Sequence, residues 1–448
     1  MSFLANQIQR WRLGIEALAV GLAAVFTLMA PLDAHALPSF ARQTGQNCVA
    51  CHAGGQFPEL TPYGRMFKMT GYTIGERTVP LSVMGVVNYA NIARPPPDTA
   101  KNAEVVFASG SVFLAGKITD NIGAFAQVTY DNYAADNGDG SFSGHSNADN
   151  MDFRFANHIV GDKQDWVYGV SLNNNPSVSD PWNSAAAWMG YVPAASLNSH
   201  QFSDPKTPFP SFGSGGNIAG LNGYLFWNKT VYAELGTYRT ADQVFSFMSE
   251  GIADANKHKL DGSNNPYWRL ALSHEWGAHN LMVGTSGMIA HVYDAGTDTS
   301  DSANLGQFRN KGIDAQYQYI LDPHTVTAQL AYMQQETTYS DNAVVAAGGI
   351  SGQTDTNNVS RAKVSYVYQA KYGGSLAYFN KTGTTNVQTD PATNGMTYEA
   401  FWIPKQNIRI GAQYTAYNKF NGATDNYDGA GRNANDNNTL FLYAWFAF

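Results

Sequence analysis

The amino-acid sequence predicts an all-β protein, an antiparallel barrel of about sixteen membrane-spanning strands with little helix. Three observations predict it: a polar composition with few charges, an alternation of apolar and polar residues with period two, and connections that alternate between short and long. Transmembrane β-barrels combine these features because each strand faces lipid on one side and an aqueous lumen on the other.

The composition argues against several other classes of protein. Of the 448 residues, 14% are charged and 13% are aromatic, whereas an ordinary soluble domain has roughly 25% charged residues. A helical membrane protein needs runs of about 18 apolar residues, and a disordered chain is poor in aromatic residues. The net charge of −8 argues against nucleic-acid binding.

Residues 1–36 are predicted to be a secretory signal peptide. Arg10 and Arg12 form a positive n-region, residues 17–32 form an apolar core, and residues 34–36 (A-H-A) form a cleavage site. The alternative is a single membrane anchor, for which this core is short. An exported chain with a barrel-like composition is expected in the outer membrane of a Gram-negative bacterium.

Residues 79–448 are predicted to form the barrel, because alternation of period two recurs along them. In one example, Ile122, Ala124, Ala126, Val128 and Tyr130 share a face, and Gln127, Thr129 and Asp131 lie on the other. Such segments begin near residues 79, 103, 121, 149, 164, 218, 229, 266, 278, 310, 324, 357, 373, 396, 407 and 437.

The connections between these segments alternate in length. Short ones lie at residues 120–121, 161–163, 228, 277, 322–323, 373–374 and 404–406, and long ones include 133–148 and 174–217. Outer-membrane barrels have short periplasmic turns and long outer loops, so both barrel ends are expected in the periplasm. The last segment, 440–448, ends on an aromatic residue, and no internal repeat supports the alternative of a propeller.

The two cysteines of the chain both lie in the run Cys48-Val49-Ala50-Cys51-His52. This C-x-x-C-H spacing is that of c-type haem attachment: two thiols bond to the two vinyl groups of one haem, and the adjacent histidine becomes the proximal iron ligand. Attachment takes place after export, which agrees with a signal peptide. The sequence therefore predicts one covalent haem c in a short segment, residues 37–78.

Two other interpretations compete with haem attachment. A disulfide between Cys48 and Cys51 would not require His52. A zinc site would need two further ligands nearby, and residues 53–78 contain no other Cys or His.

A short helix is expected after the motif, at residues 61–70. Its signals are Thr61 as N-cap, Pro62 at the first position and Gly71 after the end. Within it, Met66 and Met69 share a face, and either thioether is a candidate distal iron ligand. The alternatives are that both methionines pack against the porphyrin, that a barrel histidine such as His158 supplies the ligand, or that the position is open.

A segment as short as residues 37–78 seldom buries a core unaided, so the barrel is expected to shield the haem. Sixteen strands enclose a wide lumen. The charged residues predicted to point into it are Asp152, Arg154, His158, Arg269, Glu275, Arg361, Lys363 and Arg409. They are expected to line a polar pore, to pair across the lumen, or to contact haem propionates.

Residues 41–52 (ARQTGQNCVACH) and 57–72 (FPELTPYGRMFKMTGY) resemble the outer-membrane cytochrome–porin fusions of iron-oxidising bacteria, which are monohaem iron(II) oxidases. The resemblance covers the architecture of the mature chain and is specific over residues 41–72. It implies that Cys48 and Cys51 carry the haem, that His52 ligates it, and that Fe(II) is oxidised at the cell surface. It assigns no residue to iron contact.

The expected function is therefore uptake of electrons from extracellular Fe(II) and their transfer to a periplasmic c-type cytochrome or other carrier. One alternative keeps the same conduit with another extracellular donor or direction. Another is a substrate-selective porin whose haem is a sensor or a plug. The haem segment is expected in the barrel lumen or at its periplasmic mouth, and the sequence leaves the oligomeric state open.

Overall fold

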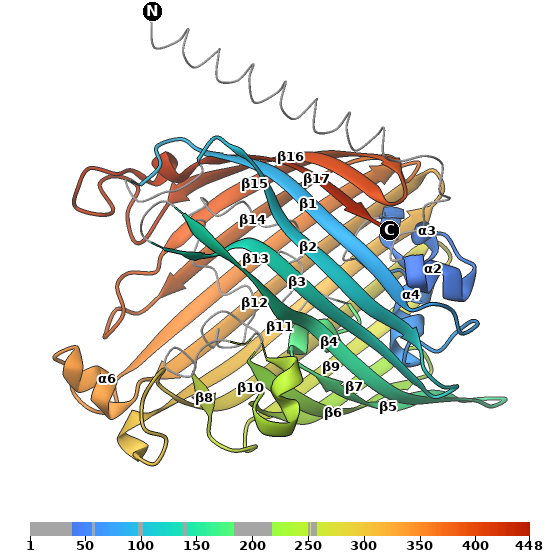
Figure 1. Cartoon of the computed structure of the whole chain (residues 1–448), viewed down its shortest axis with the longest axis horizontal. Helices are drawn as coiled ribbons and strands as arrows, with labels where there is room; N and C mark the ends of the chain where they lie inside the picture. The colour runs from blue at the N-terminus through green and yellow to red at the C-terminus, as the bar shows by residue number, and fades with distance from the viewer. Residues whose placement is uncertain are drawn as a thin grey trace, which may run out of the picture.

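The computed structural model describes residues 38–55, 59–96, 102–137, 141–182, 217–249, 251 and 258–448. The predicted signal peptide lies outside the described residues, as do Phe57 and Pro58. The described chain forms a β-barrel, seen from the side in Figure 1. Three short helices, α2 (Pro38–Thr44), α3 (Cys48–Cys51) and α4 (Pro62–Met69), gather at one end of it.

The strands are β1 (Leu81–Ile92), β2 (Val105–Lys117), β3 (Ile122–Asp136), β4 (Phe142–Val160), β5 (Asp165–Asn173), β6 (Ile218–Trp227), β7 (Val231–Thr240), β8 (Lys259–Leu260), β9 (Pro266–Trp276), β10 (His279–Tyr293), β11 (Leu305–Leu321), β12 (His324–Thr338), β13 (Thr354–Tyr368), β14 (Tyr372–Gly383), β15 (Thr393–Lys405), β16 (Ile408–Lys419) and β17 (Thr439–Ala447). The other short helices are η1 (Ala53–Gly55), α5 (Pro176–Ser179), η2 (Gln243–Met248), η4 (Ser302–Asn304), α6 (Asp341–Ala346) and η5 (Ala434–Asn437).

Within the described residues, seventeen strands form one sheet. β8 has only two residues, and the other sixteen pair antiparallel in chain order, with β7 beside β9. β1 pairs with β17, with Met84 opposite Ala447, so the sheet closes into a ring. Closure leaves no edge whose backbone groups would be exposed to lipid. The prediction of an antiparallel barrel of about sixteen strands is confirmed.

Two strands begin five or more residues earlier than the alternation predicts. β4 begins at Phe142 instead of residue 149, and β11 begins at Leu305 instead of residue 310. The expected loop 133–148 is therefore mostly a hairpin formed by the outer ends of β3 and β4, where His145 lies opposite Asp131. Polar residues pair there through their backbones, and side-chain alternation cannot reveal such pairing.

The outer face of the wall is apolar. Large side chains exposed on it include Leu114, Val128, Leu221, Leu235, Leu272, Ile313, Leu330, Val364 and Leu376. Such a band faces lipid in a transmembrane barrel, so the architecture is that of an outer-membrane β-barrel. No helix in the described part of the chain is long and apolar enough to cross a bilayer.

The inner face is polar, and most of the charges predicted to point inward are buried there: Asp152, Arg154, Arg269, Arg361, Lys363 and Arg409. Buried charges pair with one another, since Arg269 Nη1 lies 2.5 Å from Asp314 Oδ1 and Arg409 Nη2 lies 2.6 Å from Glu399 Oε1. His158 and Glu275 are instead exposed. They lie close to the ends of β4 and β9, where the strands leave the barrel interior.

Residues 174–182, the described start of the connection after β5, do not extend outward as the start of a long outer loop. Almost every one of these nine residues is buried, including Asp180 and Trp182 at 1% exposure each. Lys68 of α4 donates a hydrogen bond to the Asp180 carbonyl, 3.0 Å away. This α5 segment (residues 174–182) therefore folds into the lumen and packs on the N-terminal helices.

Candidate functional site

The helix expected after the motif is present as α4 and has the predicted ends. Thr61 Oγ1 accepts a hydrogen bond from the Gly64 backbone N–H at 3.1 Å, and Pro62 occupies the first position. Gly71 follows the last turn with φ +74°, a left-handed conformation that glycine adopts without strain. These local signals need no tertiary contact, which is why the sequence predicts them.

The C-x-x-C-H motif and α4 contact one another through their backbones. The Thr61 N–H donates to the Cys51 carbonyl at 2.9 Å, and Thr61 Oγ1 donates to the Ala50 carbonyl at 2.5 Å. A Cβ atom on Gly64 would lie 2.2 Å from the Cys51 carbonyl oxygen. Glycine at position 64 therefore permits the close approach of α4 to α3, a role that the sequence alone does not show.

The two cysteine sulfurs are not joined in a disulfide. Cys48 is buried, and its Sγ lies 3.2 Å from Oε1 of Gln406, in the turn between β15 and β16. Burial, with a smaller contribution from Cys48, raises the pKa of Cys51 to about 11. A thiol with this pKa stays protonated at neutral pH and is a poor redox nucleophile.

His52 follows α3 in an extended conformation and bridges to Leu60. Burial lowers the pKa of His52 to about 4, so the imidazole is neutral near pH 7, the form that binds a metal. Among the described residues, no three His, Cys, Asp or Glu side chains gather as a metal site. Haem attachment at this motif stays a prediction.

Met66 and Met69 face away from the haem motif. With 3.6 residues per turn, they lie about 160° and about 140° around α4 from Gly64, which contacts Cys51. Both pack into a cluster on the β4–β10 wall, where Met69 is 1% exposed beside Trp182. The structure thus shows Met69 in a protein core and the partly buried Met66 packed against it, and a distal ligand role for either stays a prediction.

His158, the other candidate distal ligand, is also occupied elsewhere. Its Nε2 lies 2.7 Å from Asp165 Oδ1, and these residues flank the short turn between β4 and β5. The structure does not bring this histidine to the Cys48–His52 motif, which contacts β11, β12 and β13 through η1.

The N-terminal segment is anchored to one side of the lumen by α4 and Tyr72. Buried Arg65 donates to Asn280 Oδ1 at 2.6 Å and to Gln318 Oε1 at 2.9 Å, on β10 and β11. Tyr72 donates its hydroxyl to Asp152 of β4 at 2.6 Å. Each of these hydrogen bonds is buried and involves a charged group. Such a bond contributes about 1.5–3 kcal/mol to the stability of the folded protein.

Further anchors lie on the other side of the lumen. Lys363 of β13 lies 2.8 Å from Glu59, and both side chains are buried. Gln43 of α2 donates to the Tyr72 carbonyl at 2.6 Å and accepts from the Lys117 backbone N–H at 2.8 Å. The segment thus crosses the barrel mouth and is tied to strands around the ring, at the end where β17 also finishes (Figure 1). By the rule that short turns are periplasmic, this is the periplasmic end.

Comparison with known proteins assigns no family. No family model matches the chain. Among curated proteins, it is 28% identical over 124 residues to phosphoribosylformylglycinamidine synthase subunit PurL of Zymomonas mobilis, covering 24% of this chain and 17% of that protein. It is 30% identical over 112 residues to PurL of Nitrobacter hamburgensis, covering 22% of this chain and 15% of that protein. The chain spans less than a fifth of the length of these relatives, so their activity is not carried over.

Among solved structures, the chain is similar to the outer membrane channel DcaP of Acinetobacter baumannii, with 11% identity and a TM-score of 0.43 over 82% of this chain and 96% of that chain. It is also similar to OmpF of Salmonella typhi, with 11% identity and a TM-score of 0.46 over 82% of this chain and 97% of that chain. Similarity at this level carries no argument about function. The assignment as an outer-membrane β-barrel rests on the strand pairing and the apolar outer band.

Proposed function

We propose that the protein is an outer-membrane cytochrome–porin fusion that takes electrons from extracellular Fe(II) and passes them to a periplasmic carrier such as a c-type cytochrome. The observation that carries this proposal is the seating of the C-x-x-C-H segment across the barrel mouth. A haem motif held there lies between the outer membrane surface and the periplasm.

Residues of this chain suit a covalent haem c. Cys48 and Cys51 would hold it through thioethers, and the neutral imidazole of His52 would ligate its iron. Haem c, when bound, supplies reversible one-electron transfer. The barrel wall and α4 cover the motif. The barrel would therefore shield the haem from water, which residues 37–78 are too short to do alone.

The ferrous substrate is supported by the resemblance of residues 41–72 to the iron oxidases. Oxidation outside the cell would keep poorly soluble Fe(III) out of the periplasm. The direction follows from the donor: Fe(II) loses one electron outside, and the periplasmic carrier gains one. No described residue is assigned to Fe(II).

The test is haem reduction in proteoliposomes after Fe(II) is added to the outside only. Wild-type protein should show the reduced haem bands promptly, whereas Cys48→Ala and His52→Ala proteins should not. If wild-type haem is reduced by dithionite but not by Fe(II), the ferrous substrate is wrong and other donors replace it. If wild-type protein contains no covalent haem, the whole proposal fails.

A further inference from the structure

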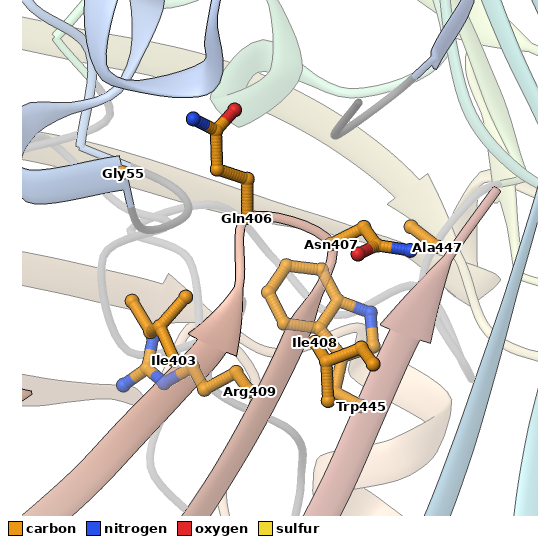
Figure 2. Close-up of a pocket in the computed structure, with 8 residues that line it drawn as sticks. All are labelled: Gly55, Ile403, Gln406, Asn407, Ile408, Arg409, Trp445 and Ala447. Atoms are coloured by element: carbon orange, nitrogen blue, oxygen red, sulfur yellow. The ribbon is translucent and has the colours of Figure 1, made fainter. Parts of the chain in front are cut away.

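The outer wall of the barrel carries a groove over β4, β5, β6 and β7. Its volume is about 550 Å³, within the roughly 300–1,000 Å³ of small-molecule sites. The hollow between Gly55 and the β15–β16 turn (Figure 2) is far smaller, at about 10 Å³, which is the space of about one water. Of the two, only the groove is large enough for an organic ligand. The outward-facing residues that line it are Phe155, Tyr168, Val170, Gly223, Leu225 and Leu235.

The groove exists because one residue in a row of outward-facing side chains is glycine. Strand pairing puts Gly223 opposite Val170 on one side and opposite Leu235 on the other. Phe155 continues the row on β4, opposite Val170. These three apolar side chains are all exposed, and a Cβ atom on Gly223 would have no atom within 4 Å. The row therefore has a notch at Gly223 with side chains on both sides.

The notch lies at the depth of lipid chains. Gly223 is six residues from Lys229, which lies in the short turn after β6. At about 3.4 Å per residue, on a strand tilted by about 35–45°, six residues reach about 15 Å into the membrane. This depth is about half of a hydrocarbon core of about 30 Å. Since the short turns are periplasmic, the groove lies within the periplasmic leaflet.

Aromatic rings lie between the groove and the periplasm. Trp166 and Trp227 are directly opposite one another on β5 and β6, and their ring centroids are 5.8 Å apart. They share the outer face with Tyr168 and Leu225, the next residues of the groove. Tryptophan side chains in such a belt lie at the level of the lipid headgroups, so a lipid in the groove has its headgroup beside this pair.

Two lysines lie beyond the tryptophans, in adjacent turns. Lys163 and Lys229 are both exposed. Their turns are joined, because the Asn228 N–H donates to the Asp165 carbonyl at 2.7 Å. The charged residues of the turns, residues 161–164 and 228–230, are these two lysines and Asp162, which leaves a net charge of +1. The turns therefore favour an anionic group.

We propose that this groove binds one phospholipid with an anionic headgroup, with an acyl chain over Gly223 and the phosphate at Lys163 and Lys229. Apolar contact alone does not select a lipid, because lipid chains are as apolar as the leucines of the wall. Here the notch supplies a shape and the ammonium groups supply a charge, and basic residues at a membrane surface bind anionic headgroups. One phospholipid matches both across a single leaflet. The site is independent of haem and goes beyond the proposed function.

The groove is tested by native mass spectrometry of the purified protein in detergent, with phosphatidylglycerol added at known concentrations. The wild-type protein should retain one lipid per chain. Gly223→Trp fills the notch and should weaken this binding several-fold, whereas Ala328→Trp should not. Ala328 is a matched control on the outer face of β12, four residues from the start of that strand at His324, just as Gly223 lies four residues from the end of β6 at Trp227. Equal binding by the two variants would overturn the groove as the site.

The match of charge is tested by the choice of lipid. The wild-type protein should bind phosphatidylglycerol several-fold more tightly than zwitterionic phosphatidylcholine. This preference should be lost in Lys163→Gln with Lys229→Gln and kept in Lys371→Gln with Lys405→Gln, which changes two exposed lysines of other short turns. A preference that survives the first double variant would overturn the assignment of the headgroup.

Two controls complete the experiment. Each variant is first shown to be folded by the heat-dependent shift of its mobility in gel electrophoresis. The oligomeric state is then read from the same mass spectra. If the wild-type protein is an oligomer that Gly223→Trp dissociates, the groove is a contact between subunits and the lipid proposal is overturned.

Discussion

The Lys363 ammonium lies 2.8 Å from the Glu59 carboxylate, although the two residues are 304 positions apart in the sequence. Lys363 belongs to the wall, on β13, and Glu59 belongs to the N-terminal segment. Both side chains are almost fully buried. This ion pair is a noncovalent link between the N-terminal segment and the barrel wall, and it makes the position of the segment testable.

Replacing Lys363 with Met should destabilise the seated segment. The substitution leaves the Glu59 carboxylate buried without its cation, and breaking a buried ion pair by removing one partner costs about 3–5 kcal/mol. The free energy of unfolding, followed by tryptophan fluorescence in lipid vesicles, should fall by this order. The double variant Lys363→Met with Glu59→Leu should recover most of the loss, and failure to recover would contradict an interaction between the two residues.

Gly64→Ala should weaken the docking of α4 on the haem motif. Its Cβ would lie 2.2 Å from the Cys51 carbonyl oxygen, and overpacking of this kind costs about 1–3 kcal/mol. The expected result is lower covalent haem content per barrel, measured by in-gel haem staining. Gly223→Ala is the control, because no atom lies within 4 Å of its added Cβ; equal haem content in the two variants would refute the close approach.

Met66→Leu and Met69→Leu should leave the spectrum of the haem unchanged. Both methionines pack into the cluster on the β4–β10 wall, and volume-conserving apolar substitutions usually cost less than about 1.5 kcal/mol. Optical and magnetic circular dichroism spectra of the ferric protein report the axial ligands. If either variant loses a methionine–iron charge-transfer band, that methionine is the distal ligand and α4 must rotate when haem is attached.

The wild-type protein should conduct ions poorly in planar bilayers. A sixteen-stranded barrel normally leaves an aqueous channel, but here the N-terminal segment crosses the mouth and the α5 segment lies in the lumen. Removal of residues 38–74 should raise the conductance several-fold, since closure through β1 and β17 does not involve them. A wild-type conductance equal to that of the deletion variant would support a passive pore instead.

Local patterns were enough to predict most of the barrel and the helix α4. The wall residues Ile122–Asp131 alternate because their two faces meet lipid and lumen, and Thr61, Pro62 and Gly71 act within a few residues of themselves. The same patterns could not predict the pairing of the polar ends of β3 and β4. The alternation also predicted that His158 points into the lumen, whereas it is exposed near the end of β4. A strand position gives the face on which a side chain lies but not its depth in the barrel.

The candidate site was predictable only where its chemistry is contiguous. One contiguous motif contains Cys48, Cys51 and His52, so these residues can be identified from the sequence without knowledge of the fold. Gln406, whose side chain contacts Cys48 Sγ, lies 358 positions away in the sequence. No local signal marks this contact, because it forms only when the β15–β16 turn and α3 meet in the folded barrel.

The sequence by itself therefore determined the strand periodicity, the helix caps and the C-x-x-C-H motif, each of which depends on neighbours a few residues apart. The tertiary structure decided the rest: that the N-terminal segment sits across the barrel mouth, that the α5 segment turns inward, and that the methionines face a protein core. These outcomes depend on buried partners such as Glu59 with Lys363 and Tyr72 with Asp152. Such partners meet only when the ring has closed, since closure brings distant strands around one enclosed, low-dielectric space in which a buried charge must find its counter-ion.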